Sequence, residues 1–343
     1  MVCHESDHVH LELLDPRHDP EPPGWEQLRR AAGQYVTWRY DLLRAYAWAA
    51  QTPVLLAVLS EGGIAVGAVL ASLRGIRPRR GSYARGRDIA GVVDVQVPGS
   101  RSEKGWWFTG DPEPERRREL LRAYVRGVRQ ALGPGWRCVL WREVPSGESA
   151  QLPGVVKVRL PTAPLARLAT PWTGIEEWYA WLGGTRGASL RSWARRLDAD
   201  PGLSIGVGPA RELVTGAEAS VLRAENDLKY RNRLFPLAPL PQPYFDGLVA
   251  SDEVVAVAYR DGRRLIGLSL TMDHPTWPIC LSWGALAPED GGRKHLYFDF
   301  YVRMVEWAIK AGKSGLVLGK GKAEIKRSLG ADLVSSSAIA VPC

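Results

Sequence analysis

Residues 287–334 constrain the fold more than any other part of the chain. Two glycines, Gly291 and Gly292, precede a pattern that is apolar on a broad face over 295–311, which predicts a helix buried over much of its circumference. A short apolar run bounded by glycine follows at 315–318, and its length and flanks favour a strand. A buried helix that leads directly into a short strand is typical of an α/β domain.

The two halves of the chain show the same order of elements. Each half has two apolar runs separated by a glycine turn, which predicts a β-hairpin, and later a long helical pattern. The hairpins fall at 54–73 and 254–272, and the long helices at 111–132 and 295–311. Duplication of one α/β unit accounts for this shared order.

The length of the chain and a change in composition predict two domains. The chain has 343 residues, enough for two domains that each bury a core. Over 146–171 the composition shifts to proline, glycine and short apolar pieces. We therefore predict an N-terminal domain of residues 1–150 and a C-terminal domain of residues 151–343.

The charge balance indicates an anionic partner. The formal net charge is +8 and the sequence pI is about 9.4, which fits nucleotides, nucleic acid or an acidic membrane. The predicted helix at 295–311 begins with Arg293, Lys294 and His295, although helix N-termini favour acidic side chains. Cations and glycines at a helix N-terminus are typical of phosphate sites, so we expect an anion there, unless these side chains simply reach into solvent.

The cysteines and the hydropathy pattern favour a cytoplasmic protein. The four cysteines are far apart and form no C-x-x-C pair, which is typical of reduced thiols. No apolar run reaches the length of a membrane span, and residues 1–10 do not have the pattern of a signal peptide. Cys3 and the histidines near it have no second group of ligands at a suitable spacing, so we expect no metal site. No feature of the sequence indicates an oligomeric state.

Two segments of the C-terminal half carry a resemblance to a known family. Residues 173–197 contain two helical patterns separated by Gly183 and Gly184, the second studded with arginine, and residues 287–334 contain the long helix, the strand and a lysine-glycine segment. Both segments resemble the second domain of FemABX-type proteins, which are built from two tandem GNAT-like acyltransferase domains. The resemblance implies an α/β fold with mixed, mostly antiparallel sheets flanked by helices. It also implies acyl transfer to an amine, from aminoacyl-tRNA or, in some relatives, from acyl-CoA.

Residues 289–294 bear on the choice between these two donors. Typical GNAT enzymes have Q/R-x-x-G-x-G/A at the start of the long helix, where it holds the pyrophosphate of CoA, whereas this chain has Glu-Asp-Gly-Gly-Arg-Lys. The long helical arm of some cell-wall members has no counterpart either. The resemblance therefore favours aminoacyl-tRNA as the donor and a small-molecule or peptide-like amine as the acceptor, for example in secondary metabolism, with no cofactor.

The donor ester is already activated, so the reaction needs positioning and charge stabilisation rather than a nucleophile. We expect Lys326 to contact a phosphate or the oxyanion. Arg293, Lys294 and Lys322 are candidate anion partners. The candidate bases are Asp273, Asp299 and His295, each with a structural role as the alternative. The other residues that we expect to bind donor or acceptor are Lys320, Arg327, Trp283, Tyr297, Tyr230, Arg231 and Arg233.

Two other functions remain open at this point. The first keeps the fold but uses acyl-CoA as the donor of an N-acyltransferase. The second is not an enzyme: a basic protein of two domains that only binds RNA or a nucleotide, with an affinity that depends strongly on salt.

Overall fold

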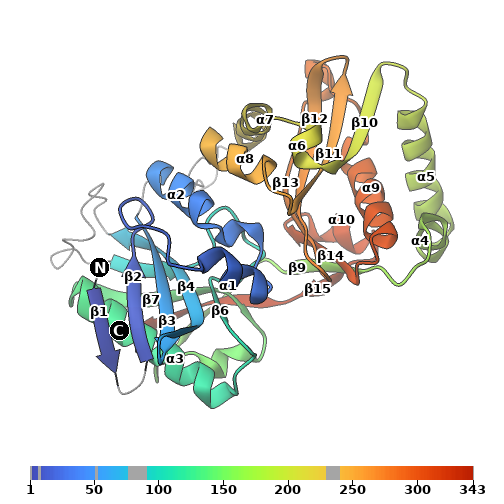
Figure 1. Cartoon of the computed structure of the whole chain (residues 1–343). Helices are drawn as coiled ribbons and strands as arrows, with labels where there is room; N and C mark the ends of the chain where they lie inside the picture. The colour runs from blue at the N-terminus through green and yellow to red at the C-terminus, as the bar shows by residue number, and fades with distance from the viewer. Residues whose placement is uncertain (1, 7–8, 51–52, 76–90, 229–239, 343) are drawn as a thin grey trace. The chain divides into compact units, whose positions relative to one another are not determined.

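The computed structural model describes residues 2–6, 9–50, 53–75, 91–228 and 240–342 (Figure 1). The chain divides into two compact units. Unit 1 consists of Met1–Ala163 and Ser335–Cys343, and unit 2 of Pro164–Val334. In each unit the described strands form one mixed, mostly antiparallel sheet flanked by helices.

The sheet of unit 1 has the strand order β1-β2-β3-β4-β5-β7-β16-β8, with β6 paired to β4. The parallel strands β5 and β7 pair at five register positions, from Gly91 opposite Trp136 to Val95 opposite Trp141. The strands are β1 (Val2–Ser6), β2 (Val9–Leu14), β3 (Val54–Glu61), β4 (Ile64–Gly75), β5 (Gly91–Val95), β6 (Trp106–Phe108), β7 (Trp136–Pro145), β8 (Val158–Pro161) and β16 (Ser336–Pro342). The helices are α1 (Trp25–Ala31), η1 (Val36–Trp38), α2 (Tyr40–Ala49), α3 (Pro114–Leu132) and η3 (Glu148–Gln151).

Helices cover both faces of the unit 1 sheet. Leu55 and Leu59 of β3 pack in one core cluster with α3, while Val54 and Leu56 join a second cluster with α1 and α2. Because successive side chains of a strand point to opposite faces, an unbroken apolar run suits a strand that is buried on both sides.

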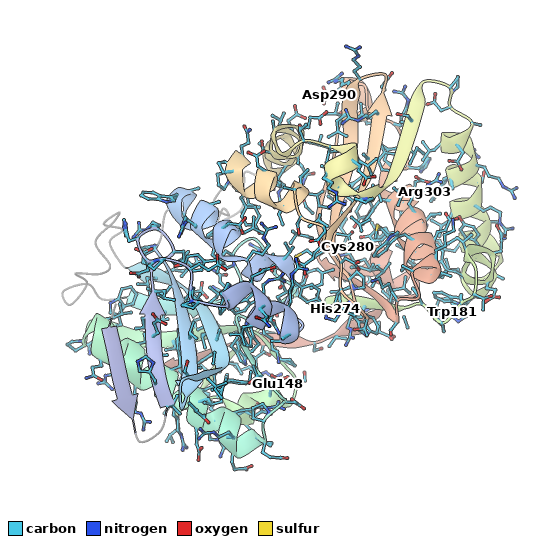
Figure 2. All side chains as sticks on the ribbon, in the orientation of Figure 1. Glu148, Trp181, His274, Cys280, Asp290 and Arg303 are labelled. Carbon is cyan, nitrogen blue, oxygen red and sulfur yellow. The ribbon has the colours of Figure 1, made fainter. Side chains whose placement is uncertain are left out.

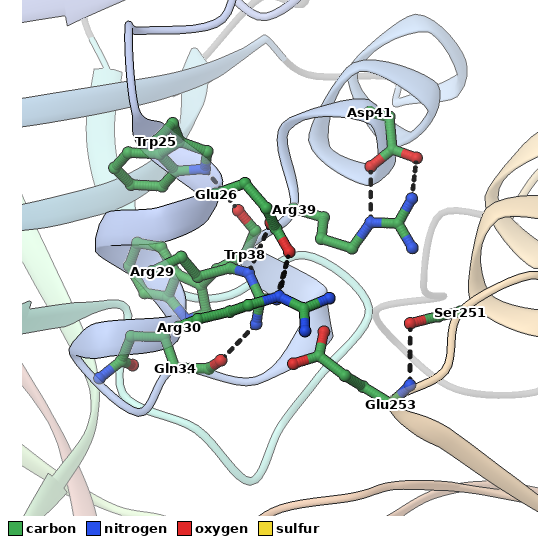
Figure 3. Close-up of polar contacts among 10 residues, drawn as sticks. All are labelled: Trp25, Glu26, Arg29, Arg30, Gln34, Trp38, Arg39, Asp41, Ser251 and Glu253. Atoms are coloured by element: carbon green, nitrogen blue, oxygen red, sulfur yellow. Dashed lines mark hydrogen bonds and ion pairs between the residues drawn. The ribbon is translucent and has the colours of Figure 1, made fainter.

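A buried arginine joins α1 to the segment that follows it (Figure 3). Arg29 is fully buried and donates hydrogen bonds to the Glu26 carboxylate, at 2.9 and 2.7 Å, and to the Gln34 carbonyl oxygen. The hydrogen bond from Arg29 is the largest cause that lowers the pKa of Glu26 to about 2. Beside this ion pair, the indole nitrogen of Trp25 donates to the Trp38 carbonyl oxygen at 2.9 Å.

The sheet of unit 2 has the strand order β10-β11-β12-β13-β14-β9-β15. The strands are β9 (Leu165–Ala169), β10 (Leu203–Pro209), β11 (Val254–Asp261), β12 (Arg264–Met272), β13 (Ile279–Ala285), β14 (Gly315–Lys320) and β15 (Asp332–Val334). The helices are α4 (Ile175–Trp181), α5 (Gly184–Asp198), α6 (Ala210–Leu213), α7 (Gly216–Leu228), α8 (Gln242–Val249), η4 (Pro288–Asp290), α9 (Leu296–Lys310) and α10 (Ala323–Arg327).

The core of unit 2 centres on α9. Phe300, Met304 and Val305 of α9 are buried together with side chains of α4, α5 and the sheet. On the other face of the sheet, α7 packs against β12 and β13, where Gly284 allows the backbone of Leu222 to come close (Figure 1). The long helix is therefore buried over most of its surface, as its apolar pattern predicts.

The fold class predicted from the sequence is confirmed, as an α/β protein with two mixed, mostly antiparallel sheets flanked by helices. The predicted helix at 295–311 is α9, and the predicted strand at 315–318 is β14. The compact units divide between Ala163 and Pro164 rather than at residue 150. The last strand, β16, also lies in unit 1 rather than in the C-terminal domain, because it pairs with β7 and β8.

Candidate functional site

Two parallel strands in unit 2 separate soon after they meet. β13 and β14 pair at one register position, Ile279 opposite Val317, whereas β5 and β7 of unit 1 pair at five. The register of β13 against β12 shifts at Leu281, and that of β14 against β9 shifts at Leu318. β-bulges of this kind bend a strand and end its pairing. The two bulges therefore coincide with the place where β13 and β14 stop pairing.

A buried lysine lies at this place. Lys326 of α10 is 3 % exposed, and its ammonium donates a hydrogen bond to the carbonyl oxygen of Lys320, the last residue of β14, at 3.2 Å. Burial lowers the pKa of Lys326 to about 8; a smaller effect of Lys322 acts in the same direction, and Cys280 of β13 acts against it. An ammonium has three donors, and within the described residues Lys320 is the acceptor that Lys326 contacts. Two N–H groups therefore remain for a ligand.

The glycines of the lysine-glycine segment make the turn that carries Lys326 to this place. Gly319 and Gly321 have φ of 77° and 82°, in the left-handed region that costs glycine little. Lys322 follows at φ 48° as the N-cap of α10. The turn between β14 and α10 is thus tight, and it returns the chain toward the end of β14.

Cys280 of β13 lies close enough to Lys326 for their charges to interact. Burial raises the pKa of the Cys280 thiol to about 11, although a hydrogen bond with Thr271 and the charge of Lys326 act in the opposite direction. The thiol is therefore protonated at neutral pH and is a poor nucleophile. Figure 2 shows Cys280 in the middle of unit 2.

Aromatic side chains of α9 and β13 border the site, and we call Tyr297, Tyr301 and Trp283 the aromatic wall. The hydroxyl groups of Tyr297 and Tyr301 are 2.9 Å apart, and the Lys322 ammonium lies 4.4 Å from the centre of the Tyr297 ring. Trp283 of β13 meets Tyr297 edge to face at 5.7 Å and stacks on Phe300 at 5.1 Å. Of the residues predicted to form the site, the structure thus brings together Lys326, Lys322, Tyr297 and Trp283, with the backbone of Lys320.

Three of the predicted residues near the start of α9 face other partners. Arg293 forms ion pairs with Asp200 at 3.0 Å and with Asp261 at 2.9 Å, so its charge is balanced. Lys294 is exposed, and the His295 ring stacks on Trp193 of α5 at 4.3 Å. Arg293 and His295 therefore contact α5 and the residues just after it, whereas Tyr297 contacts Lys322.

Asp299, a predicted base, belongs to a buried network. Its carboxylate accepts hydrogen bonds from Tyr259 at 2.9 Å and from Arg303 at 3.1 and 3.2 Å. Arg303 also pairs with Asp198, and Figure 2 shows Arg303 on α9. Burial raises the pKa of Asp299, and Arg303 is the main influence that lowers it. This geometry ties α9 to α5 and β11 and gives Asp299 no contact with Lys326.

The remaining predicted residues lie apart from Lys326 or outside the described residues. Asp273 pairs with Lys313 at 2.8 Å, and Arg327 pairs with Glu324 at 2.6 Å on the surface. Tyr230, Arg231 and Arg233 lie outside the described residues. Sequence reasoning missed Cys280, Thr271 and Tyr301. Tyr301 follows Tyr297 by four residues, a spacing that places both on one face of a helix and could have indicated it.

In the described part of the chain, no helix combines the length and the apolar character that a membrane span requires. The same residues contain no group of three or more His, Cys, Asp or Glu side chains that could hold a metal ion.

No family model matches the sequence, and no curated protein matches it either. Solved structures do match it along most of its length. The C-terminal domain of a putative lysylphosphatidylglycerol synthetase from Agrobacterium fabrum has a TM-score of 0.59 at 14% identity, covering 92% of this chain and 90% of that one. FemX has a TM-score of 0.56 at 8% identity, covering 96% of each chain. A tandem GNAT protein from the clavulanic acid biosynthesis pathway has a TM-score of 0.51 at 12% identity, covering 97% and 98%.

The chain has a tandem GNAT-like fold. At these identities the likeness is distant and concerns the fold alone. The tandem GNAT-like fold confirms the architecture that the FemABX resemblance implies. Within this fold, unit 2 has the separated parallel strands and the buried lysine, whereas β5 and β7 of unit 1 stay paired.

Proposed function

We propose that unit 2 transfers an aminoacyl group from aminoacyl-tRNA to the amine of a small-molecule or peptide-like acceptor and so forms an amide. One observation carries this proposal: Lys326 is buried where β13 and β14 stop pairing and has two N–H donors without an acceptor among the described residues. A buried ammonium with one hydrogen bond is costly, and an anionic ligand or a developing oxyanion offsets that cost.

The reaction fits the groups around Lys326. The neutral acceptor amine attacks the ester carbonyl carbon, a C–N bond forms, and negative charge develops on the carbonyl oxygen. The two available N–H groups of Lys326 stabilise this charge. When the C–O bond to the ribose breaks, the leaving oxygen takes up a proton and the new amide nitrogen loses one. An ammonium with a pKa of about 8 can donate the first proton and regain the second near neutral pH.

The aromatic wall supplies the second part of the site. The Tyr297 ring lies beside the Lys322 ammonium, and Trp283 contacts Tyr297 edge to face. Flat rings beside two cations suit an adenosine with its neighbouring phosphates, because bases stack on aromatic rings and phosphates pair with cations. The terminal adenosine of a charged tRNA has both features.

The names of the matched structures support the same class of reaction. They include a putative lysylphosphatidylglycerol synthetase domain, FemX and a tandem GNAT protein of a biosynthetic pathway. Each has a different name but shares this architecture, so they support acyl transfer more strongly than any particular acceptor.

The test uses the purified full chain, charged total tRNA and a panel of primary amines, including peptides with a free amino terminus. Mass spectrometry detects a new amide. We expect product with charged tRNA and none with deacylated tRNA. Product that forms only when acetyl-CoA or another acyl-CoA replaces the tRNA would identify an acyl-CoA-dependent N-acyltransferase instead. No amide with any donor, together with RNA binding that weakens in salt, would indicate a binding protein.

A further inference from the structure

A second positive surface lies on unit 2, on the opposite side of the α9 start from Tyr297. We define the α5 basic face as Arg186 and Arg196 of α5 together with Lys294. Among the described residues, none of these three cations has a carboxylate within ion-pair distance.

Three acids on α4, on α5 and just after α5 are already paired with other arginines. Glu176 pairs with Arg191, Asp198 with Arg303 at 2.6 Å, and Asp200 with Arg293 at 3.0 Å. The α5 basic face is therefore a group of positive charges whose neighbouring carboxylates form ion pairs with other arginines.

Cations from two elements lie close to the same imidazole ring. The pKa of His295 is lowered, first by burial and then by Arg196 of α5 and by Lys294. Like charges held together without an anion raise the free energy of the surface, and a bound polyanion relieves this repulsion. Repulsion between α5 and the start of α9 thus supports a ligand of negative charge.

Aromatic rings fix the geometry of the face. The His295 and Trp193 rings are stacked with an angle of 7° between them, and His295 is held at φ 71°. The Arg186 guanidinium lies 4.8 Å from the Phe298 ring and 5.8 Å from the Trp193 ring, and its Nε has no hydrogen-bond partner among the described residues. The Nε itself is buried, so stacking holds the guanidinium in place and a phosphate would contact its terminal N–H groups.

The shape of the face favours a chain of phosphates over a single one. Arg186 and Arg196 are ten positions apart on one helix, which corresponds to about 15 Å along its axis. A membrane is the less suitable partner, because a helix that binds lipid needs exposed apolar side chains. The apolar residues of α5, Leu190, Ala194 and Leu197, are buried in the core.

We infer that the α5 basic face binds the phosphate backbone of RNA and docks the stem of the donor tRNA outside the Lys326 site. The identification of this RNA as the donor tRNA rests on the proposed function. It assigns a role to arginines that make no contact with the reacting atoms.

The test compares two double charge reversals in the full chain. Lys294→Glu with Arg196→Glu removes two exposed cations of the face. The control, Arg122→Glu with Arg129→Glu, makes the same change of charge on exposed positions of α3 in unit 1. We expect the first variant to bind tRNA about 10- to 100-fold more weakly than the original chain. The slope of its affinity against salt concentration should correspond to about two fewer phosphate contacts. The affinity of the control should stay within about threefold of the original. Lys294→Arg with Arg196→Lys, which keeps both charges, should retain most of the affinity.

Three results would overturn the inference: unchanged tRNA affinity in the first variant, an equal loss in the control, or loss of binding to phosphatidylglycerol vesicles while tRNA binding is retained. Transfer from a short donor, an aminoacyl ester of adenosine without a stem, separates this inference from the proposed function. We expect the first variant and the original chain to transfer from the short donor at the same rate. If no donor supports transfer but tRNA affinity falls in the first variant alone, the docking surface stands and the proposed function fails.

Discussion

The ammonium of Lys326 donates a hydrogen bond to the carbonyl oxygen of Lys320 at 3.2 Å, which joins α10 to the end of β14. This bond orients a buried cation. Burying an ammonium costs free energy unless several acceptors surround it. The position is therefore one at which stability and activity oppose each other.

Replacing this lysine should stabilise the protein. The pKa of Lys326 is about 8 in the folded state against 10.5 for an ordinary lysine, so the unfolded state binds more protons between these pH values. Ionisation of Lys326 therefore leaves the free energy of unfolding unchanged above about pH 10.5. As the pH falls from 10.5 through 8, ionisation lowers the free energy of unfolding. We expect Lys326→Met to raise the free energy of unfolding at pH 7 by about 1–3 kcal/mol, measured by urea denaturation. The gain should shrink between pH 8 and 10.5, and a variant that is less stable at pH 7 would contradict this reasoning.

The same group should set the alkaline side of the pH–rate profile. In the proposed mechanism the charged form of Lys326 stabilises the oxyanion, so kcat/KM should fall as the pH rises through about 8. A bound anionic donor stabilises the ammonium, so the fall in kcat should occur at higher pH than the fall in kcat/KM. Initial rates at low and at saturating donor concentration, from pH 6 to 10, measure both. Rates that keep rising above pH 9 in both parameters would assign Lys326 the role of a base instead.

A buried carboxyl group in unit 1 makes an independent prediction about stability. Glu103 is 7 % exposed, accepts hydrogen bonds from Thr37 at 2.9 and 3.1 Å, and has no cation within ion-pair distance among the described residues. Burial raises its pKa to about 7. Below about pH 4.5 the carboxyl group is protonated in both states and its ionisation costs no stability. As the pH rises through 7, its ionisation lowers the free energy of unfolding.

Glu103→Gln keeps the shape and removes the charge. We expect it to be more stable than the original chain at pH 8 by about 1–3 kcal/mol and to differ little at pH 5. Chemical denaturation at both pH values checks this, and an equal effect at pH 5 and 8 would mean that ionisation of Glu103 is not the cause.

The packing of α5 on α4 depends on one glycine. A Cβ atom at Gly187 would lie 2.0 Å from the carbonyl oxygen of Tyr179, a contact with rigid backbone. Gly187→Ala should therefore cost about 1–3 kcal/mol and move α5. Gly184, on the same helix, has nothing within 4 Å of such an atom, so Gly184→Ala should stabilise by about 0.4–1 kcal/mol. Thermal unfolding of both variants gives the comparison, and similar effects at the two positions would refute this account of the packing.

Local patterns in the sequence predict most of the fold. The apolar spacing of α9 and the glycine turn of the β11–β12 hairpin are properties of neighbouring residues, and both are confirmed. The position of β16 is not such a property. Its partner β7 lies almost 200 residues earlier, and nothing in the short strand Ser336–Pro342 marks that pairing. The predicted boundary near residue 150 therefore misses the return of the chain to unit 1.

The candidate site shows the same limit. The lysine-glycine motif indicates a tight turn with cations, and the structure has that turn, with Lys326 buried beside it. The motif gives no sign of which lysine is buried, because burial depends on β13 and α9. Arg293 is the converse case. Its position before α9 suggests an anion site, but Asp200 and Asp261, distant in sequence, balance its charge.

The rate of amide formation by Lys326→Met is the most direct measurement of the central claim. The assay uses charged tRNA and the amine that gives the most product, with Lys310→Met as the control, since Lys310 lies on the exposed surface of α9 and pairs with Glu306. The account predicts that Lys326→Met loses at least about 100-fold in rate while remaining folded, and that the control keeps the original rate. A Lys326→Met variant that keeps the original rate with charged tRNA would contradict it.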